Sequence, residues 1–318
     1  MTARPTPAAP LPLTVIGGFL GAGKTTLLNR ILRDNRGTRY AVMVNDFGAL
    51  DIDAALVEAH DGSTVALANG CVCCSIGDSL VDALIDLVSG PRAVDHVLVE
   101  ASGVADPKRI ADIAVVDPAL ARNGIVVLAD VSEIRRLADD RLVGDAVRRQ
   151  LAVADIVVLT KVDLVEPGAV DDTETWLAEC APRAPRIRAS LGAIPIGPLL
   201  GLDAAAVATV LEPAPARGEG ADAHRHEALF HRAVLRDLPI VTRARLAAFA
   251  EGLPTSVLRA KGFVELAESG QPHLLQCVGW RHSIDATPAP PDVPRGLVVI
   301  GTADMPDAAT LRRALVDG

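Results

Sequence analysis

One short segment near the start of the chain has the composition of a phosphate-binding loop. Residues 18–25 read Gly-Phe-Leu-Gly-Ala-Gly-Lys-Thr and match the pattern Gly-x-x-x-x-Gly-Lys-[Ser/Thr]. Such glycines let backbone amides approach phosphates, Lys24 reaches the β- and γ-phosphates, and the Thr25 hydroxyl binds Mg²⁺. A glycine-rich turn without a ligand is the alternative, but the predicted strand before the loop and helix after it favour nucleotide binding. We assign this binding to Gly18, Gly21, Ala22, Gly23, Lys24, Thr25 and Thr26.

A second motif indicates which base the nucleotide carries. The apolar run 156–159 leads into Thr160-Lys161-Val162-Asp163. GTPases read guanine with Asn-Lys-x-Asp after a late strand, and some have Thr in the first position. Asp163 would accept hydrogen bonds from guanine N1 and the exocyclic amine, whereas adenine would leave this carboxylate desolvated and unpaired. An ordinary strand-to-helix turn is the alternative. The order of the two motifs favours guanine, with Thr160, Lys161 and Asp163 in the site.

An acid at the end of another apolar run completes the expected chemistry. Glu100 closes the run 96–100 and is followed by Ala101-Ser102-Gly103. We expect Glu100 to support Mg²⁺ through a water molecule and the Gly103 amide to sense the γ-phosphate. A capped strand end is the alternative. The predicted catalytic residues are Lys24, Thr25 and Glu100.

Three of the five cysteines stand together in Asn69-Gly70-Cys71-Val72-Cys73-Cys74. A closed structural zinc site needs four ligands, usually in two separate pairs, and Cys180 and Cys277 are distant in sequence. The cluster therefore predicts an open, exchangeable metal site of Cys71, Cys73 and Cys74, with Asp46 as a further ligand. Buried small apolar side chains and a thiol redox switch are the alternatives. A bridge between neighbouring cysteines would be strained.

The place of the cysteines in the chain links the metal to the nucleotide. They lie between residues 45–48, where a GTPase has its first switch, and residues 100–103. A metal there would touch the loops that rearrange when the γ-phosphate leaves, so we expect metal affinity to depend on the nucleotide. Thiolates favour Zn²⁺, while water or carboxylate ligands leave room for Co²⁺.

Composition limits the other partners of the chain. The 318 residues carry 31 basic and 40 acidic side chains, a net charge of -9, which disfavours nucleic acid and anionic membranes. No apolar run approaches the roughly 18 residues of a membrane-spanning helix. Residues 1–10 lack the apolar core of a signal peptide, and the odd cysteine count fits a reducing compartment. We therefore expect a cytoplasmic protein.

The elements that must position these motifs alternate between strand and helix over residues 13–190. Strands are predicted at 13–16, 40–44, 64–67, 96–100, 125–129, 156–159 and 187–189. Helices are predicted at 24–33, 77–88, 107–115, 142–153 and 169–179. This alternation predicts an α/β fold, a parallel P-loop sheet flanked by helices.

Residues 212–227 are rich in Pro, Gly and charge, which predicts a linker. Beyond it we expect strands at 229–235, 256–266, 273–278 and 296–300 and helices at 242–251 and 306–316. The predicted organisation is a GTPase domain at 11–211, a linker at 212–227 and a smaller α+β domain at 228–318.

Taken together, these motifs resemble those of the CobW-type P-loop GTPases, which are regarded as metallochaperones. The resemblance rests on residues 17–26, 69–74, 100–107 and 160–163, and on 258–263 with 275–279 for the C-terminal domain. It implies slow GTP hydrolysis coupled to delivery of zinc, or in some branches cobalt, to a client protein. Two departures concern Ala49, where the family often has Glu, and the linker, which has only His224, His226 and the nearby His231. The second departure argues against a metal-storage tail.

Two other functions fit the same residues. One is a GTP-switched redox or interaction module in which the cysteines report oxidation. The other is an activator of one specific metalloenzyme, such as a nitrile hydratase. No residue is an obvious water-orienting Gln, so we expect slow intrinsic hydrolysis. The sequence leaves the oligomeric state open, a homo-oligomer included.

Overall fold

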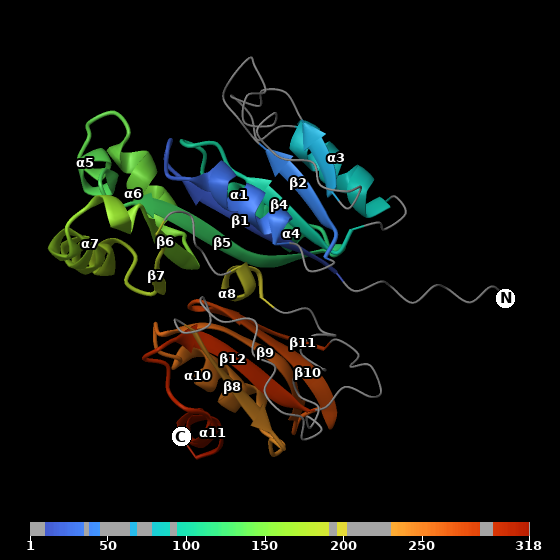
Figure 1. The fold of residues 1–318 in the computed structure, drawn as a ribbon. Coiled ribbons are helices and arrows are strands. Elements are labelled where there is room, and N and C mark those ends of the chain that lie inside the picture. The colour runs from blue at the N-terminus through green and yellow to red at the C-terminus, as the bar shows by residue number, and fades with distance from the viewer. Residues whose placement is uncertain are drawn as a thin grey trace. The chain divides into compact units, whose positions relative to one another are not determined.

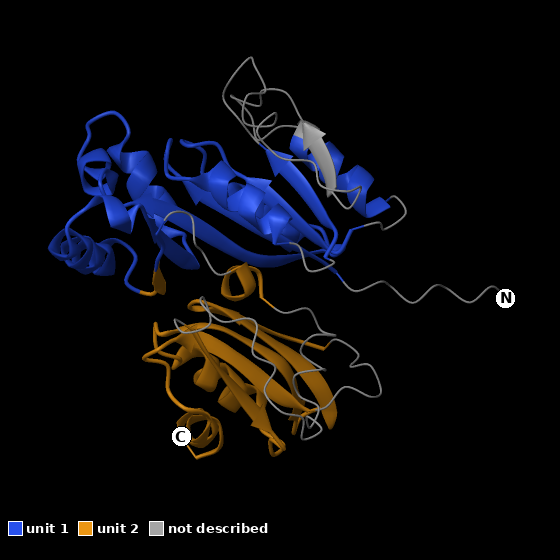
Figure 2. Ribbon diagram, in the orientation of Figure 1, with its two compact units in different colours: residues 1–182, 188–194 blue, residues 183–187, 195–318 orange. Residues whose placement is uncertain are grey.

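The computed structural model describes residues 10–34, 38–44, 64–68, 78–89, 94–190, 196–201, 230–286 and 295–317. The chain divides into two compact units (Figure 2). The first comprises Met1–Pro182 and Arg188–Ile194, and the second comprises Arg183–Ile187 and Pro195–Gly318. The predicted domain limits of 11–211 and 228–318 stay a prediction, because residues 202–229 lie outside the described part.

Six strands of a seven-stranded sheet form the centre of the first unit, in the order β3-β2-β4-β1-β5-β6, and the short β7 follows β6 in the strand order (Figure 1). The strands are β1 (Leu11–Gly18), β2 (Tyr40–Val44), β3 (Thr64–Ala68), β4 (His96–Glu100), β5 (Leu120–Asp130), β6 (Ile156–Thr160) and β7 (Arg186–Arg188). Each pair of neighbouring strands in the series from β3 to β6 runs parallel. The predicted P-loop sheet is therefore confirmed.

Helices cover this sheet, as its burial pattern requires. The successive residues Leu13, Thr14 and Val15 of β1 are fully buried, and successive side chains of a strand point to opposite faces. Both faces are therefore covered. The helices are α1 (Lys24–Arg33), α3 (Asp78–Ser89), α4 (Pro107–Val116), α5 (Ile134–Ala138), α6 (Gly144–Ala152), η1 (Val162–Leu164) and α7 (Pro167–Cys180).

The strand order determines where a ligand can bind. Strand β1 lies between β4 and β5, although the chain reaches these strands much later. The loops after parallel strands gather at the carboxyl edge of the sheet, and a crevice opens where the order reverses. The loop after β1 therefore shares one edge with the ends of β4, β5 and β6.

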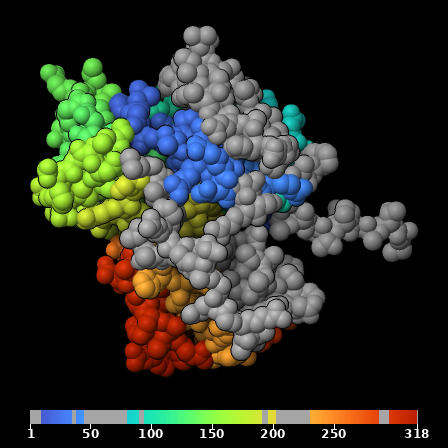
Figure 3. Space-filling model, in the orientation of Figure 1, coloured from blue at the N-terminus to red at the C-terminus, as the bar shows by residue number. Residues whose placement is uncertain are grey.

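The second unit is built on an antiparallel five-stranded sheet in the order β11-β10-β9-β12-β8. Its strands are β8 (Phe230–Arg236), β9 (Val257–Leu266), β10 (Gln271–Val278), β11 (Arg281–Asp285) and β12 (Gly296–Thr302), and its helices are α8 (Ile196–Leu200), α10 (Arg243–Glu251) and α11 (Ala308–Val316). The C-terminal segment, red in Figure 3, reaches the surface of this unit. The predicted α+β domain is confirmed.

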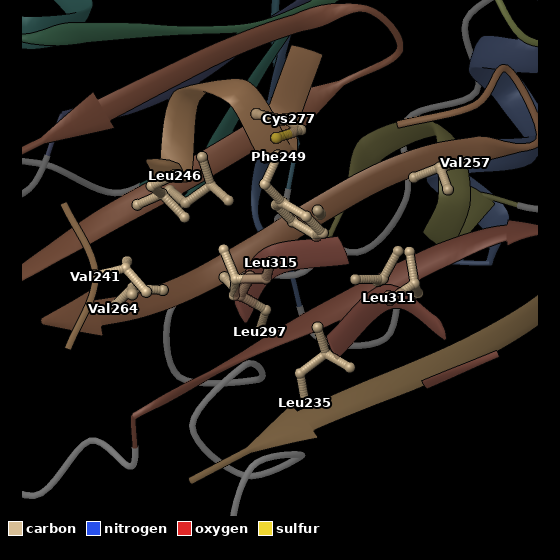
Figure 4. Close-up of a cluster of buried hydrophobic side chains, with 14 of the residues drawn as sticks. Leu235, Val241, Leu246, Phe249, Val257, Val264, Cys277, Leu297, Leu311 and Leu315 are labelled. Atoms are coloured by element: carbon tan, nitrogen blue, oxygen red, sulfur yellow. The ribbon is translucent and has the colours of Figure 1, made fainter. Parts of the chain in front are cut away.

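The core of the second unit lies between the sheet and helices α10 and α11 (Figure 4). Leu246 and Phe249 from α10 and Leu315 from α11 meet Leu297 of β12 there. Capping side chains fix both helix starts, since Thr242 accepts from the Arg245 amide and Asp307 accepts from the Thr310 amide. Helix α10 therefore begins one residue later than the predicted helix at 242–251, and α11 begins two residues later than the predicted helix at 306–316.

Arg259 of β9 orders helix α8 within the second unit. The buried guanidinium donates from Nε to the Pro198 carbonyl oxygen at 2.7 Å and also donates to the Leu199 carbonyl oxygen. These are carbonyls at the C-terminal end of α8, which have no partner within a helix of five residues. The predictions missed α8, and they also missed α5 and β11.

Candidate nucleotide-binding site

The loop between β1 and α1 is shaped by two of its glycines. Gly18 has φ of 133°, and a Cβ there would lie 2.6 Å from the Leu128 carbonyl oxygen of β5. Gly23 has φ of 99° and caps the N-terminus of α1. These conformations hold the loop against β5 and turn it into the helix. The first amides of the helix then face an anion-binding position.

Lys24 and Thr25 are the first residues of α1. Lys24 is 8% exposed, and its Nζ atom donates to the Phe19 carbonyl oxygen at 3.3 Å. The ammonium therefore bends back over the loop. The Thr25 hydroxyl donates to Oε1 and Oε2 of Glu100 at 3.0 and 3.3 Å. The structure thus brings together the three residues that were predicted to be catalytic.

The pair of Thr25 and Glu100 has the chemistry of a magnesium site. Mg²⁺ prefers oxygen ligands and keeps several of its water molecules in proteins. The Thr25 hydroxyl supplies one such oxygen, and the Glu100 carboxylate, only 2% exposed, lies at hydrogen-bond distance behind it. These residues fit a Mg²⁺ ion bound by Thr25 and held by Glu100 through water. A bound Mg²⁺ would neutralise charge on the phosphates.

The predicted base-reading motif joins the phosphate loop directly. Thr160, the last residue of β6, donates from Oγ1 to the Ala22 carbonyl oxygen at 3.0 Å, and both residues are buried. Lys161 follows with φ of 59°, a left-handed conformation that turns the chain into η1. Asp163 lies in η1 and is exposed. The two motifs, far apart in sequence, therefore lie side by side in the fold.

A sequence profile of the CobW/HypB/UreG nucleotide-binding domain matches residues 12–188, and a profile of the CobW C-terminal domain matches residues 230–317. The first match covers more than half of the chain. The chain belongs to the CobW/HypB/UreG family. Its first unit is a P-loop nucleotide-binding domain of the GTPase class, as the motifs predict.

Named relatives in this family cover most of the chain. The zinc chaperone CobW of Pseudomonas aeruginosa is 34% identical over 86% of this chain and 82% of its own length. The zinc chaperone CobW of a Sinorhizobium species is 29% identical over 94% of this chain and 95% of its own. The zinc chaperone YjiA of Escherichia coli is 34% identical over 59% of this chain and 60% of its own.

Two polar residues that contact these segments were missed by the sequence analysis. Asp130 ends β5, and its Oδ2 atom lies 2.5 Å from the Lys161 ammonium. Gln150 of α6 is buried and donates to the carbonyl oxygens of Gly103 and Ala105. Asp130 could have been predicted from the sequence, because it is an acid at the end of an apolar strand like Glu100. Gln150 was harder to predict, because the sequence shows only a polar residue at a buried position of a helix.

The predicted metal ligands Asp46, Cys71, Cys73 and Cys74 lie outside the described residues. Within the described ranges, no group of three or more His, Cys, Asp or Glu side chains is placed to hold a metal ion. The predicted metal site therefore stays a prediction.

The two remaining cysteines have other surroundings. Cys277 is buried in the core of the second unit, and burial raises the pKa of its thiol to about 12. It is therefore a small apolar side chain there. Cys180 is half-buried, and its Sγ atom accepts from Arg148 at 3.8 Å. Burial is the largest cause that raises the Cys180 pKa, and Arg148 opposes it.

None of the helices in the described residues has both the length and the apolar character that a bilayer crossing needs.

Proposed function

We propose that this chain is a Mg²⁺-dependent GTPase that couples its nucleotide state to the binding and delivery of a divalent metal. The observation that carries the nucleotide half is the bond from Thr160 Oγ1 to the Ala22 carbonyl oxygen. It fixes the base-reading motif against the phosphate loop. A nucleotide held by Lys24 at its phosphates can then present its base to Lys161 and Asp163.

Guanine fits this arrangement better than adenine. The exposed Asp163 carboxylate can accept from the two donors of guanine, and Lys161 offers its aliphatic stem to the face of the base. Adenine has no donors at those positions, so it would leave the carboxylate unpaired. Thr25 and Glu100 hold Mg²⁺ at the other end of the nucleotide.

The metal half of the proposal rests on the sequence Cys71-Val72-Cys73-Cys74. Three thiols so close together supply soft ligands without closing a four-ligand site, so the metal can exchange. Three family relatives are named zinc chaperones, which favours Zn²⁺ over Co²⁺. We place Asp46 in the same ligand set because it belongs to the first-switch segment.

The proposed cycle needs a partner and a compartment. Two relatives are named zinc-regulated GTPase metalloprotein activators, which supports a client metalloprotein as the metal acceptor. Free thiols of this kind require a reducing compartment, so we place the protein in the cytoplasm. Metal or client binding is expected to accelerate hydrolysis, since the site motifs include no water-orienting Gln.

A competition titration tests the coupling. Metal-free protein, purified anaerobically, is titrated with Zn²⁺ and Co²⁺ against a chromophoric chelator in three states: alone, with GDP and Mg²⁺, and with a non-hydrolysable GTP analogue and Mg²⁺. The proposal expects one high-affinity metal per chain and an affinity difference between the two nucleotides of about 5–150-fold. Equal affinities with both nucleotides would remove the coupling.

Matched cysteine variants test the site itself. Cys73→Ser is expected to lose the stoichiometric metal, while Cys180→Ser keeps it. Wild-type protein that carries no metal after anaerobic purification and reconstitution would instead favour the redox module. In that case oxidation of the cysteines, rather than Zn²⁺, should change nucleotide affinity.

A further inference from the structure

A buried glutamine joins helix α6 to the turn that follows Glu100. The Gln150 side chain is nearly inaccessible, with the residue 2% exposed. Its Nε2 atom donates to the Gly103 carbonyl oxygen at 3.0 Å and to the Ala105 carbonyl oxygen at 2.9 Å. Because a side-chain amide has two N–H donors, one residue holds two peptide groups of the turn.

The turn is also fixed at both of its ends. The Ala101 amide donates to the Ile16 carbonyl oxygen at 2.9 Å, which attaches the start of the turn to β1. The Ala105 amide closes the turn onto the Ser102 carbonyl oxygen at 3.0 Å, and Asp106 then caps α4. Between these two ends, the Gln150 side chain donates hydrogen bonds to the carbonyl oxygens of Gly103 and Ala105.

This turn packs directly on the phosphate loop. A Cβ atom on Gly103 would lie 2.7 Å from Cγ and Cδ2 of Leu20 and 2.9 Å from the Leu20 amide nitrogen. Leu20 is the third residue of the phosphate loop. A small displacement of the turn therefore changes its distance to the position of the nucleotide phosphates.

A second feature marks the turn as a place where a ligand completes the hydrogen bonds. The Ser102 Oγ atom is buried and has no hydrogen-bond partner among the described residues. Buried hydroxyls in native proteins are normally paired, so an unpaired one calls for an explanation. A phosphate oxygen or an ordered water beside it would supply the missing partner.

We propose that Gln150 is a positioning residue for GTP hydrolysis, which holds the turn of residues 102–105 at the distance from the phosphate loop where it distinguishes triphosphate from diphosphate. The inference rests on the proposed binding of GTP by the first unit. Gln150 touches neither nucleotide nor metal in this role. It acts through the backbone of Gly103.

The role predicts a selective defect rather than a general loss of binding. GDP has no γ-phosphate, so its affinity should depend little on the turn. A GTP analogue should lose the contacts that the turn makes with the γ-phosphate. The ratio of the two affinities therefore separates positioning from folding.

Three variants of α6 provide the test. Gln150→Met keeps the length of the side chain and removes both donors. Val147→Ala removes buried volume from the same helix without removing a hydrogen-bond donor, and Arg149→Gln changes an exposed position. For each protein, the affinities for GDP and for a non-hydrolysable GTP analogue are measured with Mg²⁺, together with kcat, KM and Tm.

We expect Gln150→Met to lower kcat and the preference for the GTP analogue over GDP by about tenfold each, with GDP affinity within about twofold of wild type. Val147→Ala should lower Tm and leave the preference unchanged, and Arg149→Gln should change neither. A wild-type preference retained in Gln150→Met would overturn the inference, as would an equal loss in Val147→Ala.

Two further measurements keep the outcome decisive. Gln150→Glu places a carboxylate against two carbonyl oxygens and should be worse than Gln150→Met; wild-type behaviour of this variant would also overturn the inference. If Gln150→Met does not fold, Gln150→Asn replaces it, because its amide is one methylene too short. Wild-type protein that binds no GTP would refute the proposed function instead.

Discussion

The ammonium of Lys161 lies 2.5 Å from Oδ2 of Asp130, and this ion pair joins the end of β6 to the end of β5. Asp130 is held from its other side, since Oδ1 accepts from the Ser132 amide at 3.0 Å and from the Ser132 hydroxyl at 2.6 Å. The carboxylate is therefore fixed, and it fixes the tip of Lys161 in turn. What Lys161 then offers to a guanine base is its aliphatic stem.

Asp130→Asn should consequently weaken guanine nucleotide binding. The Asp130 side chain is 9% exposed but that of Lys161 is 38% exposed, so solvent screens part of the attraction. We expect the affinity for GDP to fall about 3–10-fold, with a smaller change for ADP, because adenine does not use Lys161 and Asp163 together. Fluorescence titration with labelled GDP and ADP measures both.

Asp171→Asn is the matched control for this change. Asp171 pairs with Arg188 at 2.6 Å on the exposed surface of α7, and neither residue belongs to the nucleotide motifs. Its substitution should leave GDP affinity within about twofold of wild type. If the two variants behave alike, Asp130 has no specific role in base recognition.

Thr25→Val should separate magnesium from nucleotide. The substitution keeps the shape of the side chain and removes the hydroxyl that lies 3.0 Å from Glu100. We expect GTP hydrolysis to fall by about two orders of magnitude, while GDP affinity without Mg²⁺ changes little. The measurement is hydrolysis over a range of Mg²⁺ concentrations, with the exposed Thr175→Val of α7 as control. Normal Mg²⁺ dependence in Thr25→Val would mean that the hydroxyl is no ligand.

The elements that the sequence predicted best are the buried parallel strands. The predicted ranges 40–44 and 96–100 equal β2 and β4, because every residue of these apolar runs is buried. Strand β5 was predicted too short. Its first half reads Leu-Ala-Arg-Asn-Gly, in which Arg122 and Asn123 interrupt the apolar pattern, and this half joins the sheet by pairing with β1. Strand β11 was missed because Arg281–Asp285 lies at a sheet edge and is mostly polar.

The candidate site divides in the same way. The phosphate loop and Thr160–Asp163 are contiguous motifs whose chemistry depends on local spacing, so the sequence predicted them. Gln150 donates hydrogen bonds to Gly103 and Ala105, which precede it in the chain by 47 and 45 positions. No local sequence pattern predicts a contact over that separation. Asp130 at the end of β5 likewise pairs with Lys161, which follows the neighbouring strand β6. Contacts of this kind arise from packing of the whole sheet.

The ion pair of Arg39 and Asp95 predicts a pH dependence of stability. Hydrogen bonds from Arg39 lower the pKa of Asp95 below its usual value. A carboxyl whose pKa is lower in the folded state stabilises the fold above its unfolded pKa of about 4, and this contribution disappears as the pH falls through the folded value. Asp95→Asn should therefore lower Tm at pH 7, and the difference in Tm between variant and wild type should shrink as the pH falls below about 4. Thermal unfolding between pH 7 and pH 3 checks this.

Cys277 provides a test that bears on the metal site. Burial raises the pKa of its thiol to about 12, so the thiol is protonated at pH 8, and the residue belongs to the buried core cluster that includes Leu275 and Leu297. We therefore expect iodoacetamide to label Cys277 only after unfolding, as followed by mass spectrometry of its peptide.

Cys277→Ser should cost about 1–3 kcal/mol of stability, because the substitution buries a hydroxyl in an apolar core. Cys277→Ala should cost less and leave zinc stoichiometry unchanged, since a protonated thiol in an apolar core cannot serve as a ligand. Loss of zinc in Cys277→Ala, with the protein still folded, would contradict this assignment and bring the second unit into the metal site.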